Sequence, residues 1–79
     1  MTKDQVQAII EQFEQDVEDY ENFARNSEKY AAMIEDILYP KWKVRKHLRK
    51  AEHWRAQGTK TQRALDAAKA YYRKNFGNN

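Results

Sequence analysis

Cysteine is absent from this chain of 79 residues, and strong helix breakers are scarce. Without cysteine there is no disulfide framework and no zinc site built on thiolates. Pro40, Gly58 and Gly77 are the only prolines and glycines. So few breakers are typical of a small number of long helices. β-branched residues never alternate over the length of a strand, so the sequence predicts no sheet.

Long apolar runs and catalytic motifs are missing as well. The N-terminus lacks the apolar stretch of a signal peptide, and no run reaches transmembrane length, so we expect a cytoplasmic protein outside the membrane. There is no glycine-rich phosphate loop, no nucleophile elbow and no His-Glu-x-x-His motif. His47 and His53 lack ligand partners at the spacing of a helical metal site. We therefore expect no enzyme, no catalytic residues, no metal site and no cofactor.

Charge is plentiful but unevenly distributed, and its sign changes at Tyr39-Pro40. Residues 1–39 contain ten acids and three bases, and residues 40–79 contain twelve bases and two acids. We expect one domain, residues 1–79, whose acidic half (1–39) and basic half (40–79) attract each other. The pI of 9.2 raises nucleic acid as a partner, but the net charge of +3 is weak for holding phosphate by charge alone.

The acidic half predicts one long helix or two shorter ones. Thr2-x-x-Gln5 fits a capping box at the start. Apolar residues then step by four and three, which defines a heptad seam of Val6, Ile10, Phe13, Val17, Tyr20 and Ala24. The seam can continue to Leu38 as one helix of roughly 35 residues, on the order of 50 Å long. Alternatively the helix breaks at Asn26-Ser27, with Ser27 capping a second helix.

The basic half predicts two further helices. Pro40 suits the first position of a helix and Gly58 suits its C-terminal cap, which gives a basic helix over 41–57. A last helix starts at Thr59 or Thr61 and runs to about Asn75, with Gly77 closing it.

The predicted fold is therefore all-α, with three or four helices. A long acidic N-terminal helix packs against a basic helix as a helical hairpin or a small bundle. Because the seam of the first helix is longer than the basic helix that covers it, we also expect a homodimer.

The basic helix presents a surface suited to binding a partner. A helical wheel places Val44, His47, Leu48, Ala51 and Trp54 on its buried face. Opposite lies a set that we call the basic arc, which consists of Lys41, Trp42, Lys43, Arg45, Lys46, Arg49 and Lys50. An aromatic ring among cations suits base stacking or a protein interface. Two structural alternatives remain open: Trp42 folds back onto Leu38 or Tyr39, and the acidic helix neutralises the arc.

A second basic set lies on the exposed face of the predicted last helix. Arg63, Arg73 and Lys74 form this secondary partner-binding set. The segment Gly58-Thr59-Lys60-Thr61 resembles the turn of a helix-turn-helix motif. In that interpretation Gln62, Arg63 and Asp66 would contact bases.

These features predict a non-enzymatic, small helical interaction protein that binds a macromolecular partner and modulates or inhibits it. A protein partner is favoured over nucleic acid, because acids on the first helix would repel phosphate. The alternative is a small DNA- or RNA-binding protein that uses the basic helix 41–57. Small helical proteins with one-signed faces are common among phage and mobile-element inhibitors, which is an argument by analogy alone.

Overall fold

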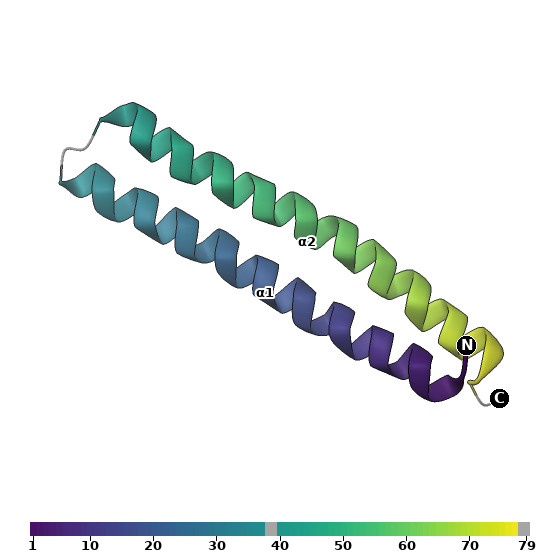
Figure 1. The fold of residues 1–79 in the computed structure, drawn as a ribbon. Coiled ribbons are helices and arrows are strands. Elements are labelled where there is room, and N and C mark those ends of the chain that lie inside the picture. The colour runs from purple at the N-terminus through teal and green to yellow at the C-terminus, as the bar shows by residue number, and fades with distance from the viewer. Residues whose placement is uncertain (38–39, 78–79) are drawn as a thin grey trace.

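The protein is a hairpin of two long helices that pack side by side (Figure 1). A computed structural model describes residues 1–37 and 40–77, with helix α1 over Lys3–Asp36 and helix α2 over Lys41–Asn75. The helices are antiparallel and form a rod with extents of 58 × 19 × 14 Å. The described residues contain no strand. The all-α prediction is therefore confirmed, with the hairpin as its architecture.

Helix α1 is continuous. The Thr2 hydroxyl accepts a hydrogen bond from the Gln5 backbone at 3.2 Å, and the Gln5 side chain accepts one from the Thr2 backbone at 2.8 Å, which confirms the capping box. The helix passes through Asn26 and Ser27 without interruption, so the alternative break there is wrong. These two residues are weak helix formers rather than breakers, and burial along the seam outweighs their low propensity.

Helix α2 is also a single helix, so the prediction of three or four helices is wrong. It runs through Gly58, and the residues expected to cap a last helix lie in its interior. The hydroxyls of Thr59 and Thr61 donate to the carbonyls of Arg55 and Gln57 at 3.1 and 2.9 Å. Because there is no turn at Gly58, the helix-turn-helix interpretation is wrong too.

The seam of α2 explains why Gly58 does not end the helix. From Val44 to Tyr72 the residues that face α1 step by three and four without a change of phase, through the position of Gly58. Breaking the helix there would turn the second part of the seam away from α1. Glycine in a helix costs only about 0.5–1 kcal/mol relative to alanine, less than the burial of one or two large apolar side chains contributes.

The ends of α2 are close to the predicted positions. Pro40 is the cap residue rather than the first helical residue, and its carbonyl accepts from the Lys43 N–H at 2.9 Å. At the other end the Tyr72 carbonyl accepts from the N–H groups of Phe76 and Gly77 at 2.8 and 2.9 Å. Gly77 therefore closes the helix, as predicted. A side-chain carbon on Gly77 would lie only 2.5 Å from the Arg73 carbonyl oxygen.

The two halves of the rod are packed differently. Near the chain ends, Val6, Ile10 and Leu65 form the buried cluster, supported by Phe13, Val17, Ala68, Tyr72 and Phe76. Near the loop, the buried seam residues are mainly small, namely Ala24, Ala31 and Ala51, with Ile34 beside the loop. Among the described residues no large side chain is completely buried. The core is therefore thin, and it is thinnest in the loop half.

Gly58 and Tyr20 face each other across the seam at the middle of the rod. A Cβ placed on Gly58 would lie 3.5 Å from the Tyr20 Cβ, which is ordinary van der Waals contact. The Tyr20 ring stacks on Trp54, which lies one helical turn before Gly58 on α2. The ring centres are 5.7 Å apart and the planes are inclined by 18°. The seam beside Tyr20 therefore has room for a methyl group at position 58.

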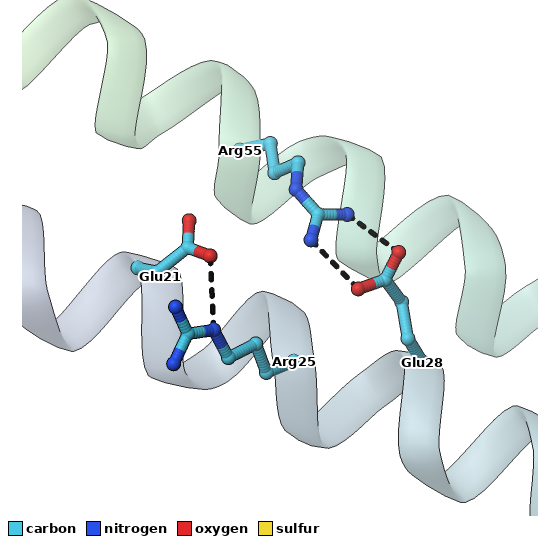
Figure 2. A network of polar contacts seen from close by, with 4 residues as sticks. All are labelled: Glu21, Arg25, Glu28 and Arg55. Carbon is cyan, nitrogen blue, oxygen red and sulfur yellow. Dashed lines mark hydrogen bonds and ion pairs between the residues drawn. The ribbon is translucent and has the colours of Figure 1, made fainter.

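Ion pairs on one flank of the seam report the register of the two helices (Figure 2). Arg55 donates two hydrogen bonds to Glu28, at 2.6 and 2.7 Å, and the Lys69 ammonium lies 3.9 Å from the Glu14 carboxylate. The two pairs are fourteen residues apart on each helix, so both belong to one antiparallel register. Glu21 pairs within its own helix, with Arg25 at 3.1 Å. We call the row Glu14, Glu21, Glu28 and Glu35 the acidic flank.

The two helices are nearly equal in length, and this removes the reason for which we predicted a homodimer. Helix α2 has 35 residues against 34 in α1, so it covers the seam of α1 from end to end. We expected part of this seam to extend, uncovered, beyond a shorter partner helix, and that expectation is wrong. Self-association itself stays a prediction.

A Gly58→Ala substitution should stabilise the hairpin by about 0.5–1 kcal/mol, measured by chemical denaturation. The added methyl group meets Tyr20 at an ordinary contact distance and raises helix propensity. Gly77→Ala is the control of opposite sign, since its methyl group collides with the Arg73 carbonyl. A destabilised Gly58→Ala variant would contradict the continuous helix.

The Glu28–Arg55 pair should make stability depend on pH. The hydrogen bonds from Arg55 lower the pKa of Glu28 below its ordinary value of 4.5. A lowered folded-state pKa contributes stability that is fully present above about 4.5 and is lost as pH falls through the folded value. Glu28→Gln should therefore lower the melting temperature at neutral pH, and the difference from wild type should shrink below pH 4.5.

Glu21→Gln is the matched comparison for this pH series, because Glu21 forms its ion pair with Arg25 on its own helix and acts on Arg55 only through a weaker Coulomb attraction. It should change the melting temperature less than Glu28→Gln does. A Glu28→Gln deficit of equal size at neutral and acidic pH would show that the pair does not contribute through its charge.

Candidate functional site

The flank of α1 opposite the acidic flank is mainly aromatic and apolar, with one acid, Asp16, in its row. Its residues repeat every seven positions, as Ile9, Asp16, Phe23, Tyr30 and Ile37. Phe23 is 46% exposed and Tyr30 is 52% exposed. Large apolar side chains left partly exposed in a row on a small protein mark an interaction surface more often than a chance exposure.

A groove runs between the two helices on this flank. Its largest hollow, about 720 Å³, is lined by Phe23, Asn26, Ser27, Lys46, Arg49, Lys50, His53 and Trp54. Two smaller hollows extend the groove toward the loop. Tyr30 and His47 line both of them, and Trp42 lines the one at the loop end. We call these three hollows together the aromatic groove. Trp54 and Trp42 are twelve residues apart on α2, so the groove is about 18 Å long.

The small seam residues of the loop half explain why a groove forms here. Ala24, Ala31 and Ala51 are buried, and the half-buried Ser27 lines the groove itself. Such short side chains cannot fill the space between the flanks, and the rings beside them pack on one another instead. Ring centres lie 5.2 Å apart for Phe23 and Trp54, and 4.8 Å apart for Tyr30 and His47.

The basic arc forms one wall of the groove. Lys46, Arg49 and Lys50 line the largest hollow, and Lys43 and Trp42 line the hollow at the loop end. Lys41 and Arg45 are exposed on α2 outside these three hollows. The structure thus brings five of the seven predicted residues to one groove. Their role in binding stays a prediction.

The groove is positively charged, because Lys46, Arg49 and Lys50 line it and none of its described lining residues is an acid. The glutamates of α1 in this half, Glu21, Glu28 and Glu35, belong to the acidic flank on the other side of the seam. In the described part of the chain, Lys46, Arg49 and Lys50 form no ion pair. The cross-helix pairs between described residues use Arg55 and Lys69, neither of which belongs to the basic arc.

Trp42 stands at the loop end of the groove and is 57% exposed. The Lys43 ammonium lies 5.5 Å from the centre of its ring, a cation–π distance. The alternative in which Trp42 folds onto Leu38 or Tyr39 lies outside the described residues.

The secondary set lies elsewhere on α2. Arg63, Arg73 and Lys74 are exposed in the half of the helix near the chain ends, outside the groove. Gln62 donates to Asp66 at 3.0 Å on that same continuous helix. The three residues expected to contact bases therefore do not follow a turn.

Some predictions about the buried face need correction. Leu48 is 43% exposed, because it lies just outside the seam formed by Val44, His47 and Ala51. His47 is half-buried against Tyr30, at the edge of the seam as the wheel predicts. Within residues 1–37 and 40–77, no three potential metal ligands cluster. Neither α1 nor α2, as described, is both long and apolar enough to cross a bilayer.

In comparisons with protein-family models, with curated proteins and with solved structures, no match to this chain was found. The groove is therefore the feature of the molecule from which a function can be proposed. Sequence reasoning identified its basic wall but missed the opposite wall, which contains Phe23, Asn26 and Tyr30. A signal was present: Phe23 and Tyr30 are spaced by seven, one position before the seam residues Ala24 and Ala31.

The two tryptophans should report the two ends of the groove differently. Trp54 is half-buried between Tyr20 and Phe23, whereas Trp42 is 57% exposed. Trp42→Phe, which retains Trp54, should emit at shorter wavelength and be quenched less by acrylamide than Trp54→Phe, which retains Trp42. Equal quenching of the two variants would contradict the described packing of Trp54.

Proposed function

We propose that this protein is a non-enzymatic interaction protein that docks on an acidic surface of a partner protein and modulates or inhibits that partner. The docking surface is the basic arc together with the aromatic groove. One observation carries this proposal: cations and partly exposed aromatic rings share a groove, and its described lining residues include no acid.

The charge of the groove selects the partner. Lys46, Arg49 and Lys50 repel one another and lack ion pairs within the described residues. An anionic surface relieves this repulsion and accelerates association by long-range steering. Rim charges of this kind contribute more to the rate and specificity of binding than to affinity.

The aromatic side chains supply a surface that can be desolvated. Phe23, Tyr30 and Trp42 are each about half exposed. Aromatic and arginine side chains dominate the energy of protein interfaces when a partner buries them. A rod 58 Å long that lies along a partner covers the acidic surface it occupies, and other ligands of that surface are then excluded. Such competition is the simplest route to inhibition.

A nucleic-acid ligand is the second candidate, and the placement of the acids favours it. The acids on the first helix argue against phosphate as a ligand only where they face it. The glutamates of α1 in the loop half, Glu21, Glu28 and Glu35, belong to the acidic flank, on the side away from the groove. A basic groove with exposed rings can also bind a single strand, through phosphate contacts and base stacking.

Reversing the charge of the groove should abolish partner binding without unfolding the protein. Lys43, Lys46 and Lys50 lie outside the buried seam, so Lys43→Glu/Lys46→Glu/Lys50→Glu should keep the helical circular-dichroism spectrum. The tagged wild-type protein should capture its partner from a native lysate of the source cells, and the triple variant should not. Capture by the triple variant at wild-type level would show that the groove is not the docking surface.

Nuclease treatment and a direct titration separate the two candidates. A protein partner should be captured equally from lysate with and without nuclease. Labelled single-stranded DNA and RNA should not bind tightly at physiological salt. If they do bind, with affinity falling steeply as salt rises, the nucleic-acid candidate replaces the proposal.

A further inference from the structure

We infer that the aromatic groove receives an amphipathic helix of the partner that carries acids along one edge, so that the two chains together form a three-helix bundle. This inference rests on the proposed function and adds the form and chemistry of the segment that is bound. The occupant is identified from the shape of the groove, the asymmetry of its charge and the packing of its rings.

The shape of the groove fits a helix. It lies between two antiparallel helices and is about 18 Å long, which equals about twelve residues of a third helix. Apolar side chains at every third or fourth position of that helix would enter the hollow beside Ser27. A helix laid in such a groove packs at the usual distance of about 8–10 Å from each neighbour. It would also cover the thinly packed half of the hairpin.

The two walls of the groove differ in charge, which sets the orientation of the guest helix. The α2 wall carries Lys46, Arg49 and Lys50, whereas the α1 wall offers Asn26 and Tyr30 and no charge. Lys46 and Lys50 are one helical turn apart. A guest helix with acids three or four residues apart along the edge that faces α2 would meet both of them. Its other edge would be uncharged.

The packing of the rings favours apolar side chains over bases. Base stacking needs a free ring face. Trp54 contacts Tyr20 on one side, with centres 5.7 Å apart, and lies 5.2 Å from Phe23. Tyr30 packs against His47 at 4.8 Å. The rings of Trp54 and Tyr30 are therefore partly covered by neighbouring rings, which suits the aliphatic side chains of a helix better than a stack of bases.

The Trp42→Phe variant provides a direct test, because Trp54 in the groove is then the single tryptophan. The probe is a synthetic, tryptophan-free helical peptide with leucines at heptad spacing and glutamates along one edge. A twin peptide has lysines in place of the glutamates. The acidic peptide should shift the Trp54 emission to saturation, and the lysine peptide should leave it unchanged.

Charge variants made in the Trp42→Phe background locate the binding surface. Lys46→Glu/Lys50→Glu should weaken binding of the acidic peptide by about tenfold or more. Lys29→Glu/Lys60→Glu makes the same change of charge at exposed lysines outside the groove, and it should change affinity by less than about threefold. Equal losses for the two variants would show that the peptide responds to overall charge, and would overturn the inference.

Three further outcomes would overturn the inference. If the acidic peptide does not bind while a nuclease-resistant protein partner is still captured, the helix-in-groove inference fails and the proposed function stands. If oligo-dT saturates the Trp54 signal and the peptide does not, the groove is a nucleic-acid site and both fail. If sedimentation shows that a second copy of this chain closes the groove, the occupant is the protein itself.

Discussion

Each helix of this protein has a single seam of residues that must be covered, and within the chain only the seam of the other helix can cover it. The steps of three and four run from Val6 through Ile34 on α1 and from Val44 through Tyr72 on α2. The hairpin is the arrangement that aligns the two seams over their full length. This requirement keeps α2 helical through Gly58 and keeps the pairs Glu28–Arg55 and Glu14–Lys69 in one register.

The same seam also determines where the surface is hollow. Near the chain ends it contains large side chains such as Ile10 and Leu65, which fill the space between the helices. Near the loop it contains alanines and Ser27, and the space appears instead as a groove between the aromatic flank and the basic arc. The part of the rod with the weakest packing is therefore the part that offers a surface to a partner. Covering this groove would add the burial that the free hairpin lacks.

Local signals in the sequence predicted much of this fold, and tertiary packing decided the rest. The capping box at Thr2 and the closing role of Gly77 depend on a few neighbouring residues, and both are confirmed. Gly58 followed by threonines also resembles a helix end. The free energy gained by ending the helix there is smaller than the stabilisation from the buried seam that a break would interrupt. The basic wall of the groove was visible on a single helical wheel. The opposite wall was not, because only the register brings Phe23 and Tyr30 beside Lys46 and Lys50.

The account depends most on the seam being closed at its centre, where Gly58 meets Tyr20. Nuclear Overhauser measurements between the Gly58 α-protons and the Tyr20 β-protons test this contact directly, because a Cβ on Gly58 would lie 3.5 Å from the Tyr20 Cβ. We predict a strong cross-peak, together with helical chemical shifts from Gln57 through Thr61. Non-helical shifts at Gly58 and no cross-peak to Tyr20 would show that α2 breaks there, and the register, the groove and the proposals built on them would be wrong.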